Sequence, residues 1–122
     1  MMTTTIDTNL LEFLRDKVNS FIKWDLVRFF HDNPHTKDTA ESIANFTGRD
    51  LRTIERELNG LVKAGVLKSK RVSGMVVYLL NNDTTVQATI NDFMEACNDR
   101  QFRVEAIQYV IQEMQFSPRH DF

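Results

Sequence analysis

Cysteine, proline and glycine are scarce in this chain, which contains one cysteine, two prolines and four glycines. A lone thiol, Cys97, forms no disulfide within the chain and supports no multi-cysteine metal cluster, so a disulfide-stapled scaffold is excluded. No segment has the roughly 18 apolar residues that a membrane span needs, and no basic flank precedes an apolar run at the N-terminus. We therefore expect a cytoplasmic protein that neither crosses a membrane nor inserts into one.

Recognisable catalytic patterns are also missing. The sequence has no glycine-rich phosphate loop and no nucleophile beside an evident base, so we expect neither an enzyme nor a bound cofactor. His31 and His35 are four residues apart, but Pro34 interrupts the helix that would align them, and no third ligand follows nearby. We expect no metal site.

The length and composition of the chain are those of one folded domain. The chain has 122 residues, of which 42% are hydrophobic and 26% charged, close to the averages of globular proteins. Its net charge of −2 conceals a separation of charge, because residues 49–74 carry seven basic and three acidic side chains. That segment has a net charge of +4, whereas residues 1–48 carry −2 and residues 75–122 carry −4. A positive segment between acidic flanks indicates a local affinity for polyanions.

Apolar spacing predicts helices in the N-terminal part of the chain. Between residues 8 and 32, apolar side chains recur at three- and four-residue steps, which predicts one helix, or two helices broken near Asn19-Ser20. The next helix is expected to start at Asp38, because Asp38 and Glu41 have the spacing of a reciprocal helix cap. Gly48 should end it.

A third helix and a β-hairpin should follow. Asp50 is a second potential cap, and an apolar stripe continues from it to Gly65. The stripe consists of Leu51, Ile54, Leu58, Leu61 and Val62. Residues 66–72 and 75–80 are rich in valine and separated by Ser73-Gly74, which predicts two strands joined by a two-residue turn.

The C-terminal part has the pattern of one long amphipathic helix. If continuous over residues 84–115, it would be about 48 Å long at roughly 1.5 Å per residue. Its apolar residues form a heptad seam whose one charged member is Arg100, which predicts a homodimer held by this helix. The predicted interface residues are Ile90, Phe93, Cys97, Val104, Ile107, Ile111 and Met114. The helical region of residues 8–32 is the alternative dimer surface.

Residues 43–67 carry a family resemblance. The segment IANFTGRDLRTIEREL, followed by LVKAGVL and the predicted hairpin, resembles the winged helix-turn-helix of small bacterial or archaeal repressors of the ArsR and MarR type. The likeness covers about residues 20–82. It implies a mostly α fold with a β-hairpin, a winged helix-turn-helix with added N- and C-terminal helices, that binds double-stranded DNA and regulates transcription. The cysteine pair of the arsenical-resistance sensors is absent here, which disfavours a thiol-based metal sensor.

The positive segment supplies the candidate DNA contacts. If the third helix buries its apolar stripe, then Arg52, Thr53 and Arg56 point outward, with Arg49 just ahead of them. Arginine at the front of an exposed helix suits guanine edges or phosphates in a major groove. The first hairpin strand adds three cations that we expect to hold the DNA backbone. They are Lys68, Lys70 and Arg71. The alternatives are a solvated charged face on the helix and an edge strand protected from aggregation by its lysines.

The chain therefore divides into three parts in this interpretation. Residues 1–7 are a flexible leader, residues 8–82 are the DNA-binding winged helix with its N-terminal helix, and residues 83–122 are a dimerisation helix and tail. Winged helices also serve as protein-interaction modules without DNA binding, which is the first alternative function. A ligand-binding protein on the same scaffold is the second.

Overall fold

The computed structural model describes residues 8–116, and it contains six helices and three strands. The helices are α1 (Thr8–Asp16), α2 (Phe21–Asp32), α3 (Ala40–Thr47), α4 (Leu51–Lys63), α5 (Thr84–Ala96) and α6 (Arg100–Phe116). The strands are β1 (Asp38–Thr39), β2 (Leu67–Val72) and β3 (Met75–Leu80). The predicted leader and the tail after residue 116 lie outside the described residues.

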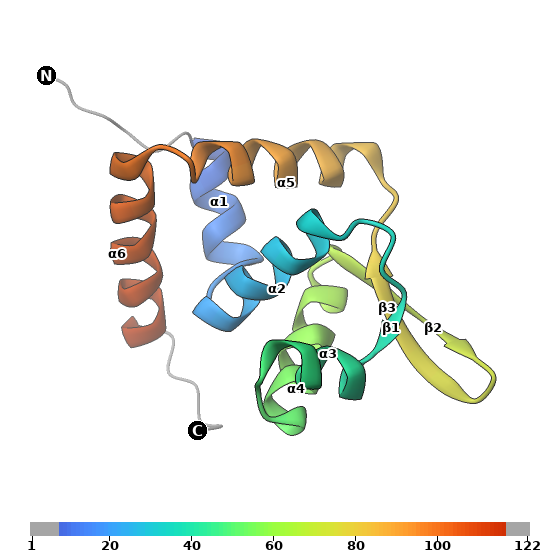
Figure 1. The fold of residues 1–122 in the computed structure, drawn as a ribbon. Helices are drawn as coiled ribbons and strands as arrows, with labels where there is room; N and C mark the ends of the chain where they lie inside the picture. Colours follow the sequence, from blue (N-terminus) through green and yellow to red (C-terminus); the bar gives the residue numbers. More distant parts are fainter. Residues whose placement is uncertain (1–7, 117–122) are drawn as a thin grey trace, which may run out of the picture.

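The order of helices and hairpin is that of a winged helix with additional terminal helices, as the sequence predicts. Figure 1 shows α3 and α4 beside the hairpin of β2 and β3, with α5 running across α1 and α2. The hairpin and α6 lie at opposite ends of the molecule. Any surface built on α4 and the hairpin is therefore remote from α6.

Residues close to the helix ends determine where most of the helices begin or end. The N-terminal region forms two helices, and Ser20 starts the second because its hydroxyl accepts a hydrogen bond from the Lys23 backbone N–H. Gly48 ends α3 in the left-handed conformation, with φ of 71°. Ser73 and Gly74 both have positive φ, 51° and 81°, as expected for the tight turn of a two-residue hairpin.

The predicted start of the second helical segment at Asp38 is wrong by two residues. Thr39 caps α3, and its hydroxyl accepts from the Ser42 backbone N–H at 3.2 Å. Asp38 instead pairs with Tyr78, which makes residues 38–39 a short third strand on the hairpin, in the order β1-β3-β2. The strand depends on pairing between distant segments, so local periodicity does not predict it.

The predicted continuous C-terminal helix is also wrong. The chain turns at residues 97–99, between α5 and α6. Asp99 begins the new helix, since its carboxylate accepts from the Phe102 backbone N–H at 2.8 Å. This turn directs the first half of the apolar seam into the core and leaves the second half on α6 outside.

Aromatic rings join the terminal helices α1, α5 and α6 to the winged unit, which consists of α2, α3, α4 and the three strands. Phe93 of α5 contacts Phe13 of α1 and Trp24 of α2, with ring centroids 5.4 and 5.2 Å apart. Phe102 of α6 packs against the same Phe93 at 6.1 Å. These contacts form one continuous core, so the terminal helices are part of the fold rather than attachments to it.

Candidate nucleic-acid interface

Helix α4 begins at a well-formed cap. The Asp50 carboxylate accepts from the backbone N–H of Thr53 at 3.0 Å and from its hydroxyl at 3.1 Å. These hydrogen bonds stabilise the charged form and lower the pKa of Asp50. Thr53, predicted to contact the groove, therefore has its hydroxyl engaged in the cap.

One side of α4 is buried and the opposite side carries cations. Ile54, Leu58 and Leu61 are fully buried, as the apolar stripe predicts. Arg52 and Arg56 consequently face solvent. The same exposed line continues through two residues that the sequence interpretation missed, although their helical spacing was visible. These are Asn59 and Lys63.

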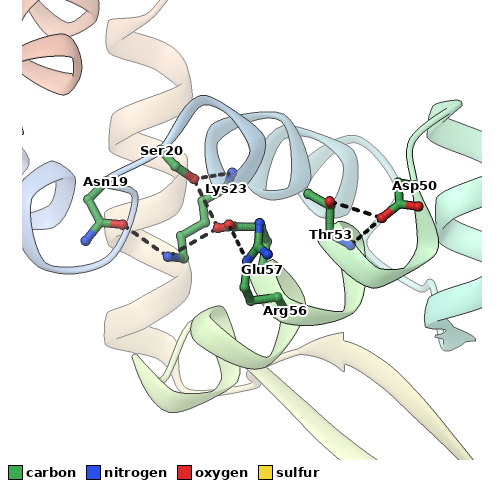
Figure 2. Close-up of polar contacts among 7 residues, drawn as sticks. All are labelled: Asn19, Ser20, Lys23, Asp50, Thr53, Arg56 and Glu57. Carbon is green, nitrogen blue, oxygen red and sulfur yellow. Dashed lines mark hydrogen bonds and ion pairs between the residues drawn. The ribbon is translucent and has the colours of Figure 1, made fainter. Parts of the chain in front are cut away.

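A buried ion pair fixes α4 on α2. The Glu57 side chain is 3% exposed, and its carboxylate lies 3.3 Å from the Lys23 ammonium. The Ser20 hydroxyl donates to the same carboxylate at 3.1 Å. Arg56 approaches it from the solvent side, with Nε 3.6 Å from Oε2 (Figure 2). A buried charge needs such partners, because leaving a carboxylate alone in the interior is costly.

Gly60 makes room for this pair. A Cβ atom at position 60 would lie 2.9 Å from Cε of Lys23, closer than real Cβ contacts allow. Glycine inside a helix is destabilising by roughly 1 kcal/mol relative to alanine. Glycine at position 60 leaves room for the Lys23 side chain, whose ammonium is held by the Glu57 carboxylate.

Arg49 lies ahead of α4 and bonds within the protein. Its guanidinium donates to the carboxylate of Asp25 on α2 at 2.5 Å, and both side chains are well exposed. An exposed ion pair of this kind is weak, so Arg49 can readily leave Asp25 and bind another anion. Of the four residues predicted to read the groove, Arg49 and Arg56 thus form ion pairs with carboxylates. Thr53 forms a hydrogen bond with the capping residue Asp50. Arg52 makes no ion pair within residues 8–116.

The hairpin cations do not share one face. Lys68 and Lys70 lie on one side of the ribbon, opposite Leu79 and Val77, whereas Arg71 lies on the other side, opposite Val76. Tyr78 is on the same side as Arg71, and its hydroxyl donates to Asn59 of α4 at 2.7 Å.

The face that carries Arg71 is therefore the one turned toward α4. Lys68, on the other face, donates to the Asn82 side chain at 3.1 Å. All three cations are exposed.

Several large apolar side chains of α3, α4 and the hairpin are exposed. Phe46, near the end of α3, is 73% exposed and is the most exposed large hydrophobic residue described. Leu51, the first residue of α4, is 45% exposed. At the hairpin tip Val72, Met75 and Val76 are exposed as well. Leu51 belongs to the apolar stripe that the sequence predicts to be buried, and for this residue the prediction is wrong.

The predicted dimer residues separate into two groups. Ile90, Phe93 and Cys97 belong to the core of the protein itself, which removes them from any surface between copies. Four residues lie on the outer side of α6, each about two-fifths exposed. They are Val104, Ile107, Ile111 and Met114.

No protein-family model matches this chain, and no curated protein matches it. Among residues 8–116, no three His, Cys, Asp or Glu side chains gather in a way that could hold a metal ion. None of the described helices combines the length and apolar character needed to cross a membrane.

Proposed function

We propose that this chain is a sequence-specific DNA-binding transcriptional regulator that acts as a homodimer, as its resemblance to ArsR- and MarR-type repressors implies. One observation carries the proposal: the exposed line of Arg52, Arg56 and Lys63 on α4 is joined to the Arg71 face of the hairpin through the Tyr78–Asn59 hydrogen bond. Cations on a helix and on an adjacent hairpin suit a groove and its neighbouring phosphates.

The residues of α4 have different roles in this proposal. Arg52 presents a guanidinium that pairs with no carboxylate of the described chain, so it is the best base-reading candidate. Asn59 has its carbonyl oxygen occupied by Tyr78, which leaves its amide as a donor. The buried Lys23–Glu57 pair holds α4 rigidly, and rigid placement of contact residues favours specificity.

The outer side of α6 is the proposed dimer surface. Its four apolar residues are flanked by exposed glutamines, and Arg100 is the one charged residue among the exposed side chains described on this helix. Depletion of charge around apolar residues is characteristic of interface cores. A two-fold pairing of antiparallel α6 helices would place Ile107 opposite Ile111 of the second copy. The dimer would present two cationic surfaces to successive major grooves, about 34 Å apart.

The test of DNA binding is selection of duplexes from a random pool by the purified protein, followed by titration at several salt concentrations. We expect an enriched palindrome and an affinity that falls steeply with salt. Arg52→Ala should weaken cognate binding by roughly 1–3 kcal/mol and relax the selected sequence. Lys37→Ala, which removes an exposed cation outside the surface, is the matched control. Absence of any enriched sequence would refute the proposal.

The test of the dimer is light scattering. Ile107→Glu places a charge in the apolar stripe and should dissociate the dimer, whereas Gln112→Glu adds the same charge beside the stripe and should not. A monomeric wild type would refute the dimer, and a well-folded Ile107→Glu protein that remains dimeric would move the interface away from α6.

A protein-interaction module is the second candidate. It is favoured by the exposure of Phe46 and Leu51, because large apolar side chains at a surface often mark protein contacts. In that case the same selection yields no enriched duplex, and any residual binding is equally weak for all duplexes.

A further inference from the structure

A hollow of about 610 Å³ lies where the C-terminal half of α2 meets the turn between α5 and α6. It exists because the helix predicted as continuous changes direction at residues 97–99. Met94 and Cys97 form its less exposed lining, and Cys97 is only 8% exposed. Its volume falls in the range that binds small molecules in other proteins.

Two arginines border this hollow from different helices. Arg28 comes from α2 and Arg103 from the first turns of α6. Arg103 is held in place, because its guanidinium donates to the backbone carbonyl of Cys97 at 2.7 Å. Neither arginine forms an ion pair with a carboxylate of residues 8–116. A guanidinium offers a planar fork of donors that matches a carboxylate or a phosphate.

Two carboxylates also line the hollow. Asp32 is 62% exposed, and its carboxylate lies 3.4 Å from the ring of His31. Glu95 is exposed at the end of α5. Apart from His31, two arginines and two carboxylates give the lining a formal charge of zero. This balance disfavours a polyanion, so a singly charged ligand would be held by local contacts with the two guanidinium groups and not by the net charge of the lining.

We propose that this hollow binds a small organic carboxylate, with its carboxylate group on Arg28 and Arg103 and its apolar part against Met94 and Cys97. Apolar contact supplies binding free energy, and the two guanidinium groups fix the orientation. The site lies at the α2–α5–α6 junction, away from the cationic line of α4, and the inference holds whether or not the chain binds DNA.

The probe is hexanoate, titrated against the full chain by calorimetry at constant ionic strength, with hexanamide as the uncharged analogue. We expect saturable binding of hexanoate and about tenfold weaker binding of hexanamide, since hydrogen bonds to charged groups are worth that factor. Arg28→Met should weaken hexanoate about tenfold and leave hexanamide unchanged. Arg100→Met, which removes an exposed cation outside the lining, should change neither.

A second measurement reports on the site directly. Alkylation of Cys97 by iodoacetamide should slow in the presence of hexanoate in the wild type, and this protection should disappear in Arg28→Met. Equal binding of hexanoate and hexanamide, an unaltered affinity in Arg28→Met, or no saturation below about 50 mM would overturn the proposal. If inorganic phosphate binds as tightly as hexanoate, the claim that the site prefers a ligand with an apolar part is wrong.

Discussion

Replacing Lys23 by methionine should strongly destabilise the protein, because it leaves the Glu57 carboxylate buried without its ammonium partner. Methionine has a similar volume, so the substitution removes the charge and creates little empty space. The carboxylate would retain the Ser20 hydroxyl at 3.1 Å and the Arg56 guanidinium at 3.6 Å. These two contacts reduce the loss without replacing a partner that lies 3.3 Å away in the interior.

The expected loss is about 3 kcal/mol, the lower end of the range for breaking a buried ion pair from one side. For a chain of this length, that corresponds to a fall in Tm of about 10 °C or more. The double variant Lys23→Met/Glu57→Met should recover most of the stability, because an apolar replacement of a buried pair is often neutral. Ser20 would still accept from the Lys23 backbone position and cap α2.

Urea denaturation is the appropriate measurement, followed both by far-UV circular dichroism and by fluorescence of Trp24, the single tryptophan. Lys37→Met, at an exposed lysine, is the matched control and should change stability by less than about 0.5 kcal/mol. A Lys23→Met protein within about 1 kcal/mol of wild type would refute the reasoning, and so would a double variant no more stable than the single one.

Three further predictions concern α4 and Cys97. Gly60→Ala, normally stabilising inside a helix, should lower Tm here because the new Cβ meets Lys23, and the same change in a Lys23→Ala background should raise it. Hydrogen bonds from Thr53 lower the pKa of Asp50 below its ordinary 3.8, so its contribution to stability is present above that pH and is lost as pH falls through the folded pKa. Asp50→Asn should keep the cap and show a smaller loss of Tm between pH 5 and pH 3, whereas an unchanged pH profile would contradict this assignment. Burial raises the pKa of Cys97, so iodoacetamide should react slowly with the native protein and rapidly in urea, and equal rates would show that the thiol is not buried.

The features predictable from sequence are those that depend on a few neighbouring residues. Asp50, Gly48 and the Ser73-Gly74 turn act through backbone preferences and short hydrogen bonds, and all three lie where the sequence places them. The outward orientation of Arg52 likewise follows from helical spacing once the buried residues of α4 are known. These predictions require no knowledge of the rest of the fold.

Features that depend on distant contacts were not predictable in the same way. The Asp38 strand needs Tyr78, and the burial of Glu57 needs Lys23 on another helix. The turn before α6 is different, because Asp99 is a recognisable cap within a periodic apolar pattern. The apolar periodicity continues across this cap, so periodicity alone predicts one helix where the cap begins a second.

The aromatic contacts of Phe93 determine whether this protein can be divided into separate fragments. They connect α1, α2 and α6 through one ring, and α2 in turn holds α4 through the Lys23–Glu57 pair. A chain cut after residue 82 would uncover Trp24 and lose the packing on one side of α2. The winged unit is thus not an exchangeable module, and transplanting its specificity into another protein requires moving side chains of α4 rather than residues 20–82 as a block.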